Sequence, residues 1–170
     1  MQYFDVLGLA PRLALDLKDL EKRFYAKSRE LHPDRFVRAP HAEQQRALEL
    51  SALLNDAYRT LREPIARAEY VLKNSGFDIG EQRSKDVPPE LLEEVFELNM
   101  ALEEADQPQI EAAGVRFDKL RAEIDQELAT RFGQWDQAAE TGTLAQIRGL
   151  LNRRRYIENL LRDVNVHLSN

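Results

Sequence analysis

The sequence predicts an all-α protein made of two helical units. Seven Gly and seven Pro in 170 residues leave room for long helices. Apolar residues repeat at helical spacing, and no segment keeps the period-two alternation of a strand. Proline, glycine and capping residues then divide the chain into six or seven helices.

The first unit is expected to contain four helices. Asp16 is a suitable N-cap for the second helix, with Asp19 three positions further on. Pro33 and Pro40 bracket the loop after it, and Asn74-Ser75-Gly76 ends the fourth helix. Leu17, Leu20, Phe24, Ser28 and Leu31 share one side of the second helix, which predicts its core face. The expected helices cover residues 4–8, 16–31, 42–62 and 64–74.

The second unit is expected to contain three helices after a linker. Residues 77–89 mix Gly, Asp, Ser and Pro-Pro, which is typical of a linker. One helix is predicted from Glu90 to Ala105, another is opened by Asp106 and Pro108, and a last one is capped by Thr143. The predicted organisation is therefore residues 1–75, a linker at 76–89 and a second unit at 90–170.

Composition excludes several classes of protein. The absence of Cys rules out a disulfide framework, thiolate catalysis and any metal site built on this chain's own sulfurs. The N-terminus lacks a basic leader with an apolar stretch, and no run reaches the roughly 18 apolar residues of a membrane span. We therefore expect a cytoplasmic protein that does not enter a membrane.

The charge of the chain is unevenly distributed. A formal net charge of −6 disfavours nucleic-acid binding. Seven basic residues lie between Asp16 and Arg38, whereas Glu90 to Glu111 holds eight acidic residues and no basic one. This asymmetry indicates two surfaces for two different partners.

The tripeptide His32-Pro33-Asp34 follows the second helix, where Pro33 stops the helix and restrains His32 to extended geometry. Lys18, Lys22 and Arg29 cluster on one side of that helix, as a solvated face or a docking surface. The tripeptide itself could be a simple turn, an acid–base pair or, with His41, a set of metal ligands. Catalysis or metal binding usually needs a third orienting group in a concave site, so we favour docking.

The first 75 residues resemble a J-domain, which has an antiparallel helical hairpin with short flanking helices. The resemblance rests on Tyr3–Leu9, on Arg29-Glu30-Leu31, on His32–Phe36 and on Asn55–Pro64. In that family the His-Pro-Asp loop and the basic face of the second helix bind an ATP-bound DnaK-type chaperone and trigger ATP hydrolysis. The resemblance thus implies a chaperone-binding site formed by Lys18, Lys22, Arg29, His32, Pro33, Asp34 and Arg35.

Nearly the whole chain resembles the HscB-type iron-sulfur cluster co-chaperones, through Arg67–Leu72, Gly76-Phe77 and the size of the second unit. The resemblance implies two partners, the specialised chaperone HscA and the iron-sulfur scaffold IscU. It implies a three-helix client-binding bundle, no cofactor and no metal ligand, and a protein that is not an enzyme. The absence of Cys agrees, since the scaffold would carry the cluster.

The helix from Glu90 has two apolar stripes. Leu91, Val95, Leu98 and Leu102 form one, and Leu92, Phe96 and Met100 form a second on nearly the opposite side, framed by glutamates. The second stripe is either a partner site or a packing face. The resemblance favours the partner site and implies scaffold-binding residues: Leu92, Phe96, Glu97, Met100, Glu104 and, on the last helix, Tyr156. Glu93 and Met100 depart from the pattern of the relatives.

Two further hypotheses remain open at this stage. The chain could be a J-domain co-chaperone for a different folded client, which titration with a cluster scaffold would decide. It could also be a small hydrolase that uses His32 and Asp34, in which case it would turn over a substrate without any chaperone.

Overall fold

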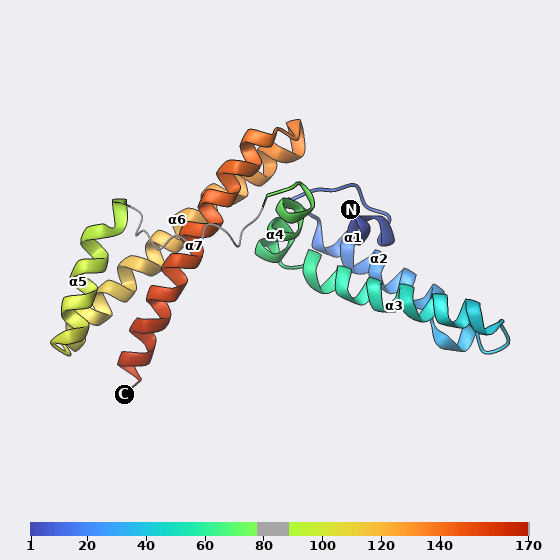
Figure 1. Ribbon diagram of the computed structural model, residues 1–170, viewed down its shortest axis with the longest axis horizontal. Helices are drawn as coiled ribbons and strands as arrows, with labels where there is room; N and C mark the ends of the chain where they lie inside the picture. Colours follow the sequence, from blue (N-terminus) through green and yellow to red (C-terminus); the bar gives the residue numbers. More distant parts are fainter. Residues whose placement is uncertain (78–88, 170) are drawn as a thin grey trace. The chain divides into compact units, whose positions relative to one another are not determined.

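The computed structural model describes residues 1–77 and 89–169, and these form seven α-helices, two short 3-10 helices and no strand. The all-α prediction is confirmed. Two compact units divide the described chain: Met1–Phe77 with Trp135–Ala139, and α5, α7 and α6 up to Gln134 (Figure 1). The elements are α1 (Gln2–Val6), α2 (Leu17–Glu30), η1 (Pro33–Arg35), α3 (His41–Leu61), α4 (Pro64–Asn74), η2 (Pro89–Leu91), α5 (Leu92–Glu103), α6 (Gln107–Ala138) and α7 (Thr141–Leu168).

An antiparallel hairpin of α2 and α3 is the main element of the first unit (Figure 1). Asp16 caps α2 as predicted, because its side chain accepts hydrogen bonds from the backbone N–H groups of Lys18 and Asp19. The rings of Phe24 on α2 and Tyr58 on α3 stack with centroids 4.2 Å apart. This packing joins α2 to α3, while Lys18, Lys22 and Arg29 of α2 are exposed.

The short helices α1 and α4 close the open end of the hairpin. Tyr3 stacks on Tyr70 at 4.4 Å, and Phe4 is completely buried. Gly76 follows α4 with a φ of +83°, and Phe77 N–H donates to the carbonyl of Leu72. This is the Schellman ending that glycine favours, so the predicted stop after Asn74 is confirmed.

Arg67 is a buried cation in the first unit. Its guanidinium donates to the carbonyls of Leu13 (2.7 Å) and Leu61 (2.6 Å). Burial lowers its pKa, and the negative charge of Asp136 opposes that shift. The Asp136 carboxylate also accepts the Leu13 N–H at 2.7 Å. These bonds fix the backbone of Leu13 and Ala14 in the loop that leads into α2.

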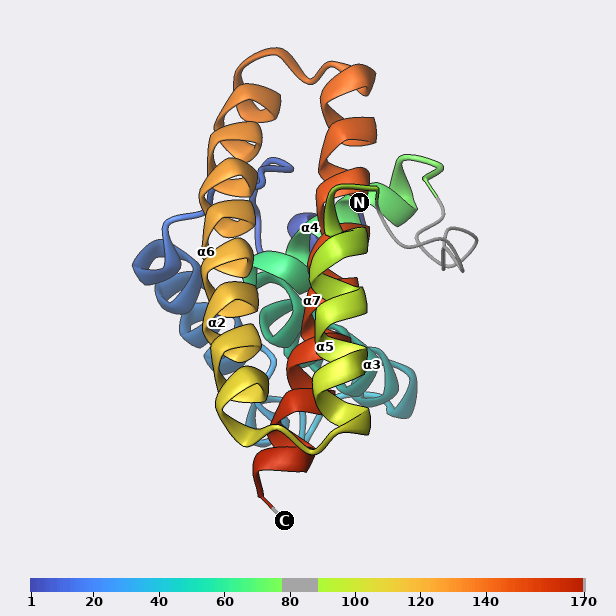
Figure 2. The ribbon, with the colours of Figure 1, turned by 90° about the vertical axis from the view of Figure 1, so that its left-hand side faces the viewer.

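The second unit is a three-helix bundle, as predicted (Figure 2). A Cβ added at Gly114 on α6 would lie 3.1 Å from Cγ1 of Val164 on α7, so glycine lets the two helices approach closely here. Ion pairs also join the three helices, as described below. The largest fully buried side chains of this unit are Leu98, Ile110, Phe117, Leu128 and Ile147.

Three sequence-based details differ from the structure. Helix α7 begins at Thr141 after Glu140, with no side-chain cap, so the predicted cap at Thr143 is wrong. Leu17 is half exposed although its spacing placed it on the core face of α2. Leu17 is the first residue of α2. Periodicity predicts which side of a helix faces the core, but not how far along the helix the neighbouring elements cover that side. The predicted linker at 76–89 lies mostly outside the described residues.

Candidate functional site

A single turn of 3-10 helix holds the His-Pro-Asp loop in shape. His32 is its N-cap, with φ −59° and ψ 133°, the extended geometry expected before proline. Arg35 N–H donates to the His32 carbonyl at 3.0 Å, and Phe36 N–H donates to Pro33 at 2.9 Å. The loop is thus a hydrogen-bonded turn that presents its side chains outward.

His32 and Asp34 interact directly. Nδ1 of His32 accepts the backbone N–H of Asp34 at 3.3 Å and lies 3.5 Å from the Asp34 Oδ2. Both side chains are exposed. Within the described residues, no group of three or more His, Cys, Asp or Glu is placed to hold a metal ion.

The predicted basic side chains lie on the exposed part of α2. Lys18, Lys22 and Arg29 are exposed, and none forms an ion pair with another described residue. Arg23 and Lys27, on other sides of the helix, pair with Asp19 and Glu30. Lys18, Lys22 and Arg29 therefore keep their charge for a partner. We call these three residues the basic face.

The loop and the basic face are connected. Nη1 of Arg35 lies 3.5 Å from the carbonyl of Arg29, at the last turn of α2. A groove of about 480 Å³ opens beside the loop, and Pro33, Phe36, Val37 and Leu48 are among its lining residues. The basic face, the polar His-Pro-Asp loop and the apolar groove are therefore adjacent at the end of the hairpin.

Tyr25 belongs to the same surface and was missed in the sequence analysis. It is exposed and lies three residues after Lys22 and four before Arg29, which places it on the basic face side of the helix. The centroids of the Tyr25 and Phe24 rings lie 5.5 Å apart. The signal was present in the spacing, but aromatic residues at helical spacing usually belong to a core. Exposed tyrosine among cations is typical of a binding anchor.

The second apolar stripe of α5 is exposed. Leu92, Phe96 and Met100 are 54%, 64% and 45% exposed, whereas Leu98 on the opposite stripe is 1% exposed. The alternative that this stripe is core of its own bundle is therefore wrong. Three neighbouring apolar side chains on one helix face form the kind of patch that partners cover.

One ion pair joins α5 to α6, and another joins η2, directly before α5, to α7. Nη2 of Arg116 on α6 lies 3.0 Å from Oε2 of Glu97, and Nη2 of Arg153 on α7 lies 2.5 Å from Oε1 of Glu90. The Leu92 stripe faces outward because Leu91, Leu98 and Ala101 on the opposite side of the helix are buried. The remaining acids of α5 form no ion pair with another described residue: Glu93, Glu94, Glu103 and Glu104.

Tyr156 lies on α7, three residues after Arg153. Helices α5 and α7 run in the same direction (Figure 2), so the Glu90–Arg153 pair places Tyr156 near the level of the first turns of α5. Its side chain is partly buried, and burial raises the pKa of its hydroxyl. Tyr156 therefore lies at about the same height in the bundle as the start of the exposed stripe.

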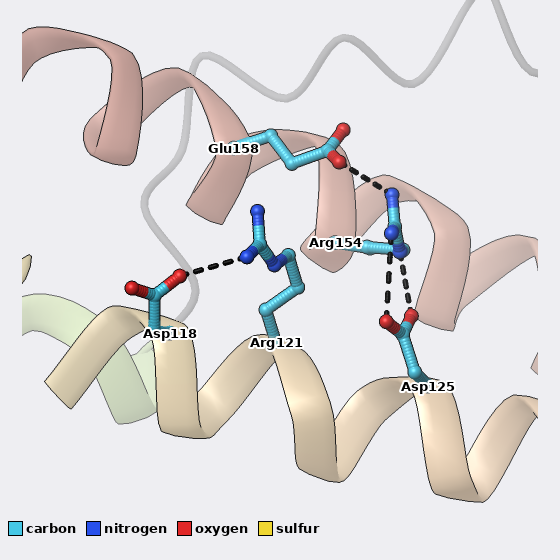
Figure 3. A network of polar contacts seen from close by, with 5 residues as sticks. All are labelled: Asp118, Arg121, Asp125, Arg154 and Glu158. Atoms are coloured by element: carbon cyan, nitrogen blue, oxygen red, sulfur yellow. Dashed lines mark hydrogen bonds and ion pairs between the residues drawn. The ribbon is translucent and has the colours of Figure 1, made fainter. Parts of the chain in front are cut away.

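A second set of polar contacts joins α6 to α7 (Figure 3). Arg154 donates to Asp125 at 2.6 Å and to Glu158 at 2.5 Å, and its hydrogen bond with Asp125 raises its pKa. Nearby, Arg121 pairs with Asp118 within α6 at 2.7 Å. Arg154 is mostly buried, so its contact with Asp125 supports the frame on which α5 rests.

Comparison with known proteins matches each part of the chain to a family. Residues 2–70 match the DnaJ domain, and residues 87–165 match the HSCB C-terminal oligomerisation domain. The solved structure of the chaperone HscB from Vibrio cholerae is 25% identical, with a TM-score of 0.65, and the match covers 97% of this chain and 96% of that one. Human co-chaperone protein HscB is 25% identical, with a TM-score of 0.71, over 96% of this chain and 80% of that one.

The hairpin, the exposed His-Pro-Asp turn and the matched domain define a J-domain protein. Such proteins work with a chaperone of the Hsp70 type. The chain belongs to the HscB-type J-domain co-chaperones, because its second unit also matches that family and both structures align over nearly its full length. No helix in the described ranges is long and apolar enough to cross a membrane.

Proposed function

We propose that this protein is a co-chaperone, and not an enzyme, that stimulates ATP hydrolysis by HscA and delivers the scaffold IscU to it. The observation that carries the proposal is the exposed His32–Asp34 turn beside the unpaired basic face. The chain itself transfers no atom and holds no cofactor. It acts by binding two proteins in the cytoplasm.

The chaperone would dock on the first unit, residues 1–75. Lys18, Lys22 and Arg29 attract an acidic surface, which raises the rate of encounter. Pro33, Asp34 and Arg35 then make the short-range contacts, since the turn holds their backbone in one conformation. The stimulating signal in this proposal is the contact of His32 and Asp34 with the chaperone.

The scaffold would dock on the second unit, residues 90–170. Leu92, Phe96 and Met100 supply the apolar centre, Glu97 and Glu104 supply charge at the rim, and Tyr156 supplies an aromatic from α7. An apolar centre with a charged rim is the usual anatomy of a protein interface. The cluster would travel on the scaffold because this chain has no Cys.

A different folded client is the second candidate. Glu93 and Met100 depart from the pattern of the relatives, and both side chains are exposed next to Phe96. A client that recognises this altered rim would bind the same helix. Such a client would leave the action on the chaperone unchanged.

The test is the steady-state ATPase rate of HscA measured with this chain, with and without IscU. We expect stimulation by the chain alone and a larger rate when IscU is added. Calorimetric titration of IscU into the chain measures the second contact by itself. Stimulation without IscU binding would favour the second candidate, and no stimulation at all would contradict the proposal.

A further inference from the structure

Glu97 differs from the other carboxylates around the exposed stripe because it already has a partner. Arg116 reaches it from α6 at 3.0 Å, and the two side chains are 45% and 52% exposed. Glu93, Glu103 and Glu104 have no ion pair within the described parts of the chain. The surface therefore offers three free negative charges and one that is neutralised from within.

Arg116 also brings positive charge to an acidic surface. Glu97 directly follows Phe96, so a protein that covers Phe96 comes close to the ion pair. A basic group on that protein is attracted by the free glutamates but repelled by Arg116. An acidic group on the partner is attracted by Arg116 but repelled by the three unpaired glutamates. A basic partner segment therefore complements the surface better.

A half-exposed ion pair of this kind is weak, since water screens it and both side chains lose entropy. We propose that Arg116 is a specificity-determining residue that competes with a basic group of the client for Glu97. Client binding then exchanges one cation for another on the Glu97 carboxylate. The inference rests on the proposed client surface, and it adds that the occupant is a segment with Lys or Arg beside its apolar residues.

The exchange can be tested with Arg116→Gln and IscU as the probe, with the dissociation constant measured by calorimetry. Freeing Glu97 should tighten binding by about two- to fivefold, the size expected for a half-exposed pair. The gain should shrink between 0.05 and about 0.5 M salt, because exposed charges are screened. Arg116→Lys, which keeps a cation near Glu97, should bind much like the unaltered chain.

A double-mutant cycle separates competition from general charge. In a Glu97→Gln background the extra gain from Arg116→Gln should vanish, because no carboxylate remains to be freed. Lys119→Gln is the matched control: it removes the same charge one turn further along α6, where Lys119 faces Glu123 of its own helix at 4.0 Å. Its effect measures the long-range contribution alone.

Several outcomes would overturn the proposal. Unchanged or weaker binding by Arg116→Gln would show that Arg116 does not compete with the client. A gain that persists in the Glu97→Gln background, or that Lys119→Gln reproduces, would show that only overall charge matters. If the unaltered chain does not bind IscU, the proposed client itself is wrong, which the first titration reveals before any variant is made.

Discussion

The backbone N–H of Asp34 donates to Nδ1 of His32 across 3.3 Å, so the first and last residues of the His-Pro-Asp turn hold each other in place. The side chains of His32 and Asp34 are 59% and 86% exposed, so both remain accessible to a partner. A partner therefore meets a prearranged pair of polar groups, and little entropy is lost when it binds.

His32→Gln and Asp34→Asn should each abolish stimulation of the chaperone's ATPase. Both side chains are exposed, so the changes remove contacts with the partner and not with the core. The hydrolysis rate gives the effect, and helical circular dichroism checks the fold. His167→Gln, at the other end of the chain on α7, is the control and should stimulate normally. Full stimulation by both loop variants would contradict the docking role.

Charge reversal at Lys22 and Arg29 should weaken binding of the chaperone, and more so at low salt. Exposed charges are screened over about 10 Å at 0.1 M salt, so the loss should narrow as salt rises. Chaperone affinity measured across a salt series tests this. Reversal of Arg59 and Lys73, exposed cations of α3 and α4, makes the same change in net charge elsewhere. A loss of chaperone affinity that is the same at every salt concentration would indicate misfolding.

Leu92→Ala with Phe96→Ala should reduce scaffold affinity at least about tenfold and leave stimulation without scaffold unchanged. Both side chains are exposed, so the melting temperature should stay nearly the same. Leu98→Ala is the contrasting variant, because Leu98 is fully buried on the same helix. It should cost roughly 2 to 5 kcal/mol of fold stability. A large drop in melting temperature for the exposed pair would instead show that they pack against something.

Arg154→Met should destabilise the second unit by about 1 to 2 kcal/mol, since it removes the bond to Asp125 that joins α6 and α7. Arg121→Met loses a pair with Asp118 on its own helix and should cost less, about 0.5 kcal/mol. Denaturant unfolding of both variants measures the difference. Equal costs would mean that the contact between the two helices adds nothing.

Alkaline pH should destabilise the fold through Tyr156. Burial raises its folded pKa above the ordinary value of 10.0. Its contribution is therefore complete below pH 10 and is lost as pH rises through the folded pKa, because the unfolded chain ionises first. Tyr156→Phe should flatten the stability curve in that range, as followed by denaturant midpoints. An unchanged curve would show that Tyr156 ionises equally in both states.

Much of the fold follows from local signals in the sequence. The Asp16 cap and the Gly76 ending appear where residue type places them, because capping depends on a few neighbouring atoms. The two stripes of α5 were visible as periodicity. Which stripe is buried depends on where α6 and α7 pack, and the apolar periodicity of α5 carries no information on that. The exposure of Phe96 therefore needed the structure.

Pairings between distant residues were not predictable from the sequence. Glu97 with Arg116 and Asp125 with Arg154 depend on the register of one helix against another. Register is decided by core packing, such as the close approach at Gly114, and many arginines offer equivalent partners in the sequence. Tyr25 was missed for a similar reason, since its exposure depends on where α3 covers α2.

Unpaired charge of both signs occurs in one polypeptide: positive on Lys18, Lys22 and Arg29, and negative on Glu93, Glu103 and Glu104. A contact between the basic patch of one molecule and the acidic patch of another would be heterologous. The first molecule would keep its acidic patch and the second its basic patch, so a further copy could add at either end. The net charge of −6 opposes such head-to-tail growth, and salt screens the attraction that drives it. Any such head-to-tail contact would therefore weaken as the ionic strength rises.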